Sequence, residues 1–227
     1  MKLITTMLVV AASLAISAPI PTLASANDGV RKLNFDVFLD DREIGFQRFT
    51  VTPTSEGKRI ETQAKFEVKI LRITAFAYDH RNTEVWRDGC LRTIDARTNS
   101  NGTKQSVSGQ DLGSKFVVTS SLGESRLGEC VASFAYWDRN ILLQRQRLLN
   151  SQTGEYTPVR IDSLGQGSVR LADREVAVER YAIRGKDMDI AITYAVDNGE
   201  WVSLDSKLDS GRTLRYRRSS AELGAVN

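Results

Sequence analysis

The sequence predicts an all-β protein, an antiparallel meander of about 10 to 12 strands that curls into a half-barrel or a closed barrel and carries one short helix. Apolar and polar residues alternate from Leu33 to Arg218. Glycine occurs in nearly every expected turn, and the turns recur roughly every 8 to 12 residues. A sheet with so many strands does not stay flat, because strand twist makes large sheets curl.

The first expected hairpin joins Leu33–Leu39 to Ile44–Thr52 through a turn at residues 40–43. Apolar residues at alternate positions of the first segment indicate a strand with one buried face. In the return strand, the apolar positions change from even to odd numbers between Phe46 and Phe49. This change predicts a β-bulge between those two residues.

The clearest pattern in the chain is in Lys58–Leu71, where apolar residues and one threonine occupy six consecutive even-numbered positions. A helix would scatter these residues around its circumference, so the pattern favours a long strand. A second long strand is expected over Ile73–Trp86. The larger side chains on one face of this strand are Phe76, Tyr78, His80 and Trp86.

Shorter strands are expected along the rest of the chain. Asn101-Gly102 is the strongest hairpin signal, because this pair accepts positive φ at both turn positions. Another turn is expected at residues 165–167, where Gly165 and Gly167 lie close together. The expected strands are Cys90–Thr98, Lys104–Ser108, Lys115–Thr119, Cys130–Phe134, Glu155–Ser163, Val176–Arg184, Met188–Val196, Trp201–Leu208 and Arg212–Arg218.

One segment, Tyr136–Gln144, interrupts the strand pattern and is expected to be helical. Asp138 is a suitable N-cap for it, because a side-chain oxygen can accept from the first free backbone amides. We expect this short helix to cover an open end of the curled sheet.

Residues 1–26 have the features of a secretory signal peptide. Lys2 is followed by an apolar run over Leu3–Ile16, and Ala24-Ser25-Ala26 ends the segment. The run is shorter than the roughly 20 residues that a membrane-spanning helix needs, although a retained membrane anchor is the alternative. We therefore expect a cleaved signal peptide at 1–26, one β domain at 27–220, a disordered tail at 221–227, and a soluble protein in the periplasm of a bacterium.

Two cysteines, Cys90 and Cys130, are expected to form a disulfide, because thiols pair in an oxidising compartment. Metal binding is the weaker alternative. Zinc needs four ligands at suitable spacing, and the one further soft ligand in the chain is His80. We expect no metal site and no cofactor.

The charge pattern gives no indication of nucleic-acid binding. The chain has 31 basic and 28 acidic residues, interspersed along its length, for a formal net charge of +3. The densest basic cluster lies near the C-terminus, where it alternates with Leu214 and Tyr216 as in an amphipathic strand. A solvated strand face is expected there, with a phosphate or anionic lipid as the alternative contact. The cluster is Arg212, Arg215, Arg217 and Arg218.

The sequence contains no recognisable catalytic motif, so we do not expect an enzyme. His80 is the single histidine, and no Gly-x-Ser-x-Gly elbow or glycine-rich phosphate loop accompanies it. A satisfied structural imidazole is the default for this residue, with ligand contact or proton transfer as alternatives.

The aromatic residues suggest a site instead. In a small barrel such side chains fill the interior, whereas in a wider one they line a cavity for an apolar ligand. A void of several hundred Å³ beside Tyr136 and Trp137 would favour the second arrangement. The expected lining residues are Phe66, Phe76, Tyr78, His80, Trp86, Tyr136 and Trp137.

Two functions are therefore favoured at this point, and an enzyme that depends on His80 is the remaining alternative. The first is a periplasmic binding or carrier module for an apolar or lipid-like molecule. The second is a structural or interaction protein of the cell envelope, with a filled core and an exposed edge strand for a protein partner.

Several blocks of the sequence resemble an uncharacterised exported domain family of proteobacteria. This family typically opens with FDVYLDG followed by IG, and the chain has Phe35-Asp36-Val37-Phe38-Leu39-Asp40 with Ile44-Gly45-Phe46. Because the family has no known activity, the resemblance implies an exported β-rich fold and no site residues. Periplasmic lipoprotein-carrier domains are similar in architecture alone. Further matching blocks are 64–69, 78–81, 84–91, 136–137 and 148–155.

Overall fold

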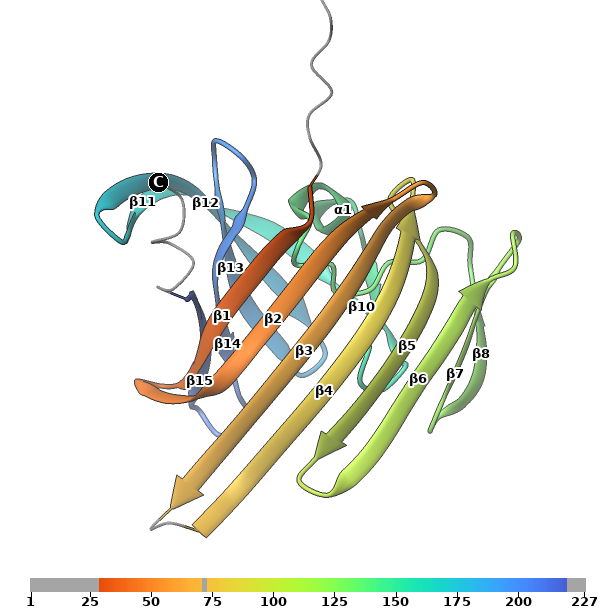
Figure 1. Ribbon diagram of the computed structural model, residues 1–227, viewed down its shortest axis with the longest axis horizontal. Helices are drawn as coiled ribbons and strands as arrows, with labels where there is room; N and C mark the ends of the chain where they lie inside the picture. The colour runs from red at the N-terminus through yellow and green to blue at the C-terminus, as the bar shows by residue number, and fades with distance from the viewer. Residues whose placement is uncertain (1–28, 71–72, 220–227) are drawn as a thin grey trace, which may run out of the picture.

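The computed structural model describes residues 29–70 and 73–219, which form a 13-stranded antiparallel sheet, a two-stranded sheet and one helical turn (Figure 1). The predicted signal peptide and C-terminal tail lie outside the described residues. The large sheet contains β1 (Arg31–Leu39), β2 (Arg42–Thr54), β3 (Gly57–Ile70), β4 (Ile73–Arg87), β5 (Cys90–Ser100), β6 (Thr103–Asp111), β7 (Phe116–Ser120), β8 (Gly123–Leu127), β11 (Arg160–Leu171), β12 (Arg174–Gly185), β13 (Met188–Ala195), β14 (Trp201–Lys207) and β15 (Thr213–Arg218). The remaining elements are α1 (Arg139–Leu143), β9 (Arg147–Leu149) and β10 (Tyr156–Pro158).

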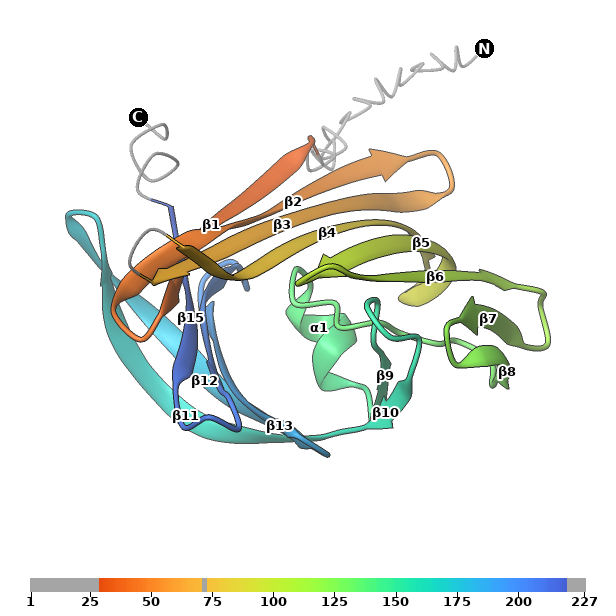
Figure 2. The same ribbon diagram turned by 90° about the horizontal axis from the view of Figure 1, so that it is seen from below.

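The large sheet is strongly curved and does not close on itself. Its strand order runs from β11 through β15 to β1 and then through β2 to β8, so β15 pairs with β1 while β8 and β11 are the edges. Residues 128–159, which connect the two edge strands, contain α1, β9 and β10. Figure 2 shows these three elements between the two arms of the curved sheet. The predicted curved antiparallel half-barrel with one short helix is therefore confirmed, with more strands than expected.

The two long strands lie where the alternation predicts them, at β3 and β4. They pair along their whole length, from Lys58 opposite Trp86 to Ile70 opposite Ile73. Pairing with β2 ends at Phe66, and pairing with β5 ends at Tyr78. The far end of this hairpin consequently extends beyond its neighbours, as Figure 1 shows.

Three local predictions are wrong, and each has a physical reason. The bulge of the first hairpin lies at Ile44, opposite the Val37/Phe38 step, and not between Phe46 and Phe49. Gly165 lies inside β11 at a bulge with φ of +90°, which an exposed edge strand tolerates. Residues 130–134 are not a strand, because Cys130 has a left-handed backbone and Ser133 makes a single isolated bridge.

Two predictions that concern residues 128–159 are confirmed, namely the N-cap of the helix and the disulfide. Asp138 is the N-cap of α1, and its carboxylate accepts from the backbone amides of Asn140 and Ile141. Cys90 and Cys130 form a disulfide that joins the start of β5 to the start of this segment.

Among the described residues, no helix has the length and apolarity needed to cross a membrane.

The concave face of the sheet holds the main hydrophobic core, and residues 128–159 cover it. Trp137, Leu142 and Leu149 of this segment are buried against side chains from the sheet. A smaller cluster lies further along the same face, around Val37 and Phe66. Part of the concave face is therefore packed by the chain itself. The largest buried side chains of the sheet are Phe35, Trp86, Phe116, Tyr194 and Trp201.

Candidate ligand site on the concave face

The inner face of β4 runs from the packed core to the extended end of the β3–β4 hairpin. Even-numbered residues from His80 to Trp86 are buried, whereas the odd-numbered residues between them are exposed or half-buried. The strand therefore presents one row of side chains to the concave side. From the extended end inward, this row is Phe76, Tyr78, His80, Asn82, Glu84 and Trp86.

Three aromatic rings form a cluster near the extended end, which we call the open-end cluster: Phe66, Tyr78 and Tyr216. Phe66 stacks on Tyr78 with ring centroids 5.1 Å apart, and Tyr216 meets the edge of Phe66 at 6.3 Å. Phe66 is buried, while Tyr78 and Tyr216 are half-buried. Phe76 lies one step further out and is 37% exposed. Apolar surface at this end thus remains accessible.

Tyr78 has a polar partner as well as an aromatic one. Its hydroxyl donates to Oε1 of Gln152 at 3.1 Å, and Nε2 of Gln152 donates to Oε1 of Gln105 at 3.0 Å. Burial raises the pKa of Tyr78 to about 12. The phenol is therefore neutral at physiological pH and is a hydrogen-bond donor at the inner border of the open-end cluster.

Buried polar side chains occupy the middle of the β4 row. Nδ1 of His80 lies 2.8 Å from Oγ1 of Thr98, and burial lowers the pKa of His80 to about 4, so the ring is neutral at pH 7. Glu84 accepts from Asn82 Nδ2 at 2.9 Å and from Trp86 Nε1 at 2.8 Å. Complete burial raises the pKa of Glu84. Such a row of polar groups inside a barrel requires partners for every member.

A cavity of about 70 Å³ lies beside these polar groups. Its walls include His80, Asn82 and Glu84 from β4, together with Tyr136 and Trp137 from the covering segment. Open grooves of about 680 and 350 Å³ are lined by Trp137 and Asp138, but the space beside both Tyr136 and Trp137 is this small polar cavity. A whole lipid-like molecule does not fit in it, because ligand pockets usually hold about 300 Å³ or more.

The seven residues expected to line a ligand site fall into three places. Phe66, Phe76 and Tyr78 lie at or near the open-end cluster, and His80, Tyr136 and Trp137 surround the small cavity. Trp86 is part of the packed core, where it meets the edge of Trp137 at 5.6 Å. The proposed lining is therefore divided between an accessible end and a packed interior.

Three residues of the site were missed in the sequence. Asn82 and Glu84 have the even-numbered positions of His80 and Trp86, but their polarity made them look like interruptions of the apolar face. Tyr216 has the parity of Leu214 in β15, but it stands within a basic cluster that predicts a solvated strand face. Position within the alternation, rather than residue type, was the signal that could have identified all three.

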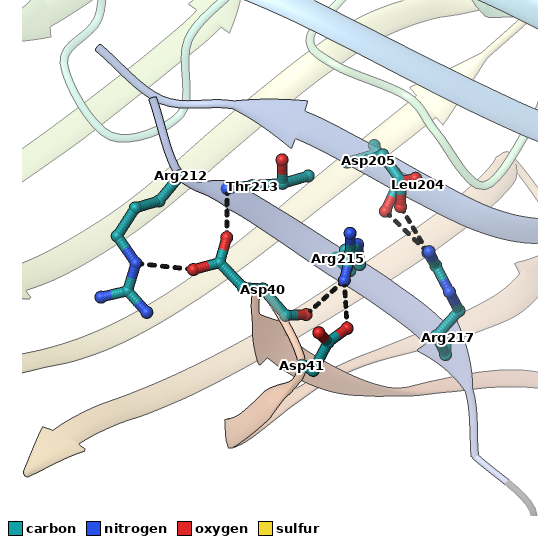
Figure 3. Close-up of polar contacts among 8 residues, drawn as sticks. All are labelled: Asp40, Asp41, Leu204, Asp205, Arg212, Thr213, Arg215 and Arg217. Carbon is teal, nitrogen blue, oxygen red and sulfur yellow. Dashed lines mark hydrogen bonds and ion pairs between the residues drawn. The ribbon is translucent and has the colours of Figure 1, made fainter. Parts of the chain in front are cut away.

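The basic cluster near the C-terminus is largely neutralised by aspartates (Figure 3). Three of its arginines form ion pairs, and a backbone amide of Thr213 together with Arg212 lowers the pKa of Asp40. These contacts join β15 to the β1–β2 turn and to β14, so we assign the cluster a structural role. The pairs are Arg212–Asp40 at 2.8 Å, Arg215–Asp41 at 2.6 Å and Arg217–Asp205 at 2.5 Å.

A larger groove, of about 740 Å³, lies on the opposite, outer face of β1 to β5. Its wall contains four basic residues, Lys32, Arg48, Arg81 and Arg97, and three acidic ones, Asp36, Glu61 and Asp95. The groove is open, polar and nearly balanced in charge, so nothing in it selects one class of ligand. The concave face remains the better candidate.

These observations define an open, β-barrel-like protein with a partly filled concave face. The family model "Domain of unknown function (DUF6134)" matches residues 35–219, so the chain belongs to this family. It is also similar to the crystal structure of a beta-barrel-like protein of domain of unknown function DUF1849 from Brucella abortus, with a TM-score of 0.60 and 11% identity over 84% of this chain and 96% of that one. At that identity the likeness concerns the fold alone. No curated protein matches the chain.

The two comparisons confirm the expected resemblance to an uncharacterised domain family and the expected β-barrel-like fold. They bring no activity, ligand or catalytic residue. Any function must therefore be argued from the residues of the concave face.

Proposed function

We propose that this protein is a binding or carrier module of the bacterial periplasm, and that it holds the apolar part of a lipid-like molecule against the open-end cluster. The observation that carries the proposal is the accessibility of this cluster. Tyr78 and Tyr216 face the concave side of a curved sheet, yet they are half-buried. Large apolar side chains that face inward and stay accessible usually indicate a binding surface.

The extended hairpin explains why the cluster is accessible. Beyond Phe66 and Tyr78, β3 and β4 pair with each other and no longer with β2 and β5. Residues 128–159 cover the concave face near Trp86 and Trp137. Phe76, by contrast, is 37% exposed. An acyl chain or similar group lying there would bury the apolar surface that the fold leaves open.

The compartment is part of the same proposal. The expected signal peptide at residues 1–26 directs export, and the Cys90–Cys130 disulfide is typical of an oxidising compartment. A periplasmic carrier would need such an accessible apolar site to receive and release its ligand.

Native mass spectrometry of the protein purified from its own periplasm tests this function. We expect an added mass that organic solvent extracts, and a Phe66→Ala, Phe76→Ala variant that carries less of it. The matched control is Arg81→Ala, which removes a side chain from the outer face of the same strand. A clean apo mass for the unaltered protein, with no binding of added long-chain lipids, would contradict the proposal.

A second function, an interaction protein of the cell envelope, is favoured by the edge strands. β8 and β11 lie at the two edges of the large sheet, and most residues of both are exposed. An unpaired edge is a template for strand addition by a partner. Crosslinking in intact cells separates the two functions: a protein partner without an extractable ligand favours this one, and a ligand without a partner favours the carrier.

A further inference from the structure

Two residues in the wall of the small cavity each have a buried polar atom without a partner among the described residues. Oδ1 of Asn82 accepts no hydrogen bond, and Nε1 of Trp137 donates none. Both residues line the cavity and are more than nine-tenths buried, at 7% and 3% exposure. Buried polar groups nearly always have a partner, so such a pair needs an explanation. One acceptor and one donor at the same cavity match a group that can both donate and accept.

The walls of the cavity indicate the charge of that group. They contain no lysine or arginine among the described residues, so an anion would find no positive partner. Glu84 is fully enclosed and already accepts from Asn82 and Trp86. A cation would leave the N–H of Trp137 unsatisfied. A neutral group, such as a hydroxyl or a carboxamide, can satisfy both Asn82 and Trp137 at once.

The position of the cavity connects it to the open-end cluster. The ring of His80, in the cavity wall, stacks on Tyr78 with centroids 6.1 Å apart, and Tyr78 stacks on Phe66. Asn82 lies four residues along β4 from Tyr78, about 13 Å at the usual rise of a strand. Apolar side chains and the polar cavity therefore follow one another along the inner face of one strand, as the two ends of an amphipathic molecule do.

We propose that the cavity binds the uncharged polar head, a hydroxyl or a carboxamide, of an amphipathic ligand whose apolar part lies against Phe66 and Tyr78. This inference rests on the proposed function and specifies the class of its ligand. The cavity volume of about 70 Å³ suits such a head group, because a water molecule occupies roughly 30 Å³.

A series of probes with one tail and different heads tests the proposal on the full mature protein. The probes are dodecanol, dodecanamide, dodecanoate and dodecylammonium at neutral pH, with calorimetry as the measurement. The two neutral probes are kept below their solubility limits and the two charged probes below their critical micelle concentrations. We expect dodecanol and dodecanamide to bind at least about tenfold more tightly than the two charged probes, because a buried charge without a partner is costly.

Two variants test whether the head-group preference comes from the cavity and the tail binding from the open-end cluster. Asn82→Leu removes the acceptor that a neutral head would use, so it should weaken the binding of dodecanol and dodecanamide toward that of the charged probes while leaving tail binding. Phe66→Ala should weaken all probes alike. Circular dichroism establishes that each variant is folded. The head-group series on the unaltered protein decides the matter even if Asn82→Leu does not fold.

The possible outcomes distinguish a failure of the cavity assignment from a failure of the proposed carrier function. Equal binding of all heads, tighter binding of dodecylammonium, or an unchanged preference in folded Asn82→Leu would overturn the cavity assignment and leave the carrier function standing. Failure of every probe to bind would overturn both.

Discussion

The two ends of the β4 inner face carry aromatic side chains in the same orientation, but their surroundings differ. At the inner end, Trp86 is 2% exposed, packs against Trp137 and donates to Glu84. At the extended end, Phe76 is 37% exposed because residues 128–159 do not cover it. The same strand pattern thus supports the core at one end and leaves apolar surface accessible at the other, and the covering segment makes the difference.

The largest expected effect is at the inner end. Trp86→Ala removes a fully packed ring and leaves a carboxylate oxygen of Glu84 without its indole donor. We expect the free energy of unfolding to fall by about 3–5 kcal/mol, as for other buried tryptophans. Urea denaturation followed by circular dichroism measures the change. A loss below about 1 kcal/mol would show that the inner end is not the packed core that the comparison requires.

The disulfide should have the next largest effect, because it anchors the covering segment at the inner end. Replacing both Cys90 and Cys130 with alanine should reduce stability by about 4 kcal/mol in the chain-entropy model for a loop of this length. Denaturant unfolding with and without a reductant measures it. Reductant should destabilise the unaltered protein and have no effect on the double variant, which serves as the control.

The polar middle of β4 should make stability depend on pH through His80. Its pKa is about 4 in the folded chain and near 6.5 when unfolded, so between these values the unfolded chain binds a proton that the folded chain does not. Stability is fully present above pH 6.5, falls as the pH falls through this window, and is about 3 kcal/mol lower near pH 4.

The raised pKa of Glu84 acts in the opposite direction, since the folded chain then binds its proton more readily and loses stability as the pH rises. Comparing the unaltered protein with His80→Gln isolates the histidine contribution. Identical pH profiles of unfolding for the two proteins would contradict a buried, neutral His80.

The smallest effect on stability is expected at the extended end. Phe76→Ala removes a partly exposed ring, so the free energy of unfolding should change by less than about 1 kcal/mol. Its effect should appear in lipid retention, because the ring adjoins the proposed apolar site. Arg81→Ala, on the outer face of β4, should change neither quantity. A large loss of stability in Phe76→Ala would remove the distinction between the two ends.

The sequence predicts local features well where one short pattern determines them. Alternation over Lys58–Leu71 specifies β3, and the side-chain chemistry of Asp138 specifies the start of α1. Burial along a strand is different, because Phe76 and Trp86 have the same parity and receive different environments from a segment remote in sequence. The site was therefore only partly predictable.

A local pattern also fails to predict which role a glycine takes. Gly165 and Gly167 look like a turn, but glycine permits a bulge in an edge strand equally well. Which of the two forms depends on the pairing with β12, and a local pattern does not contain that information.

Pairing of β1 with β15 has a consequence for the order in which the molecule can assemble. Val37 of β1 lies opposite Tyr216 of β15, so two strands from opposite ends of the described chain meet in the middle of the sheet. Contacts so distant in sequence slow folding. A chain that emerges from a translocation pore with its N-terminus first must keep one edge of β1 unpaired until the last strand arrives. If the chain is exported as proposed, the sheet can be completed only after translocation, and a chaperone that assists this step would be expected to shield the waiting edge of β1.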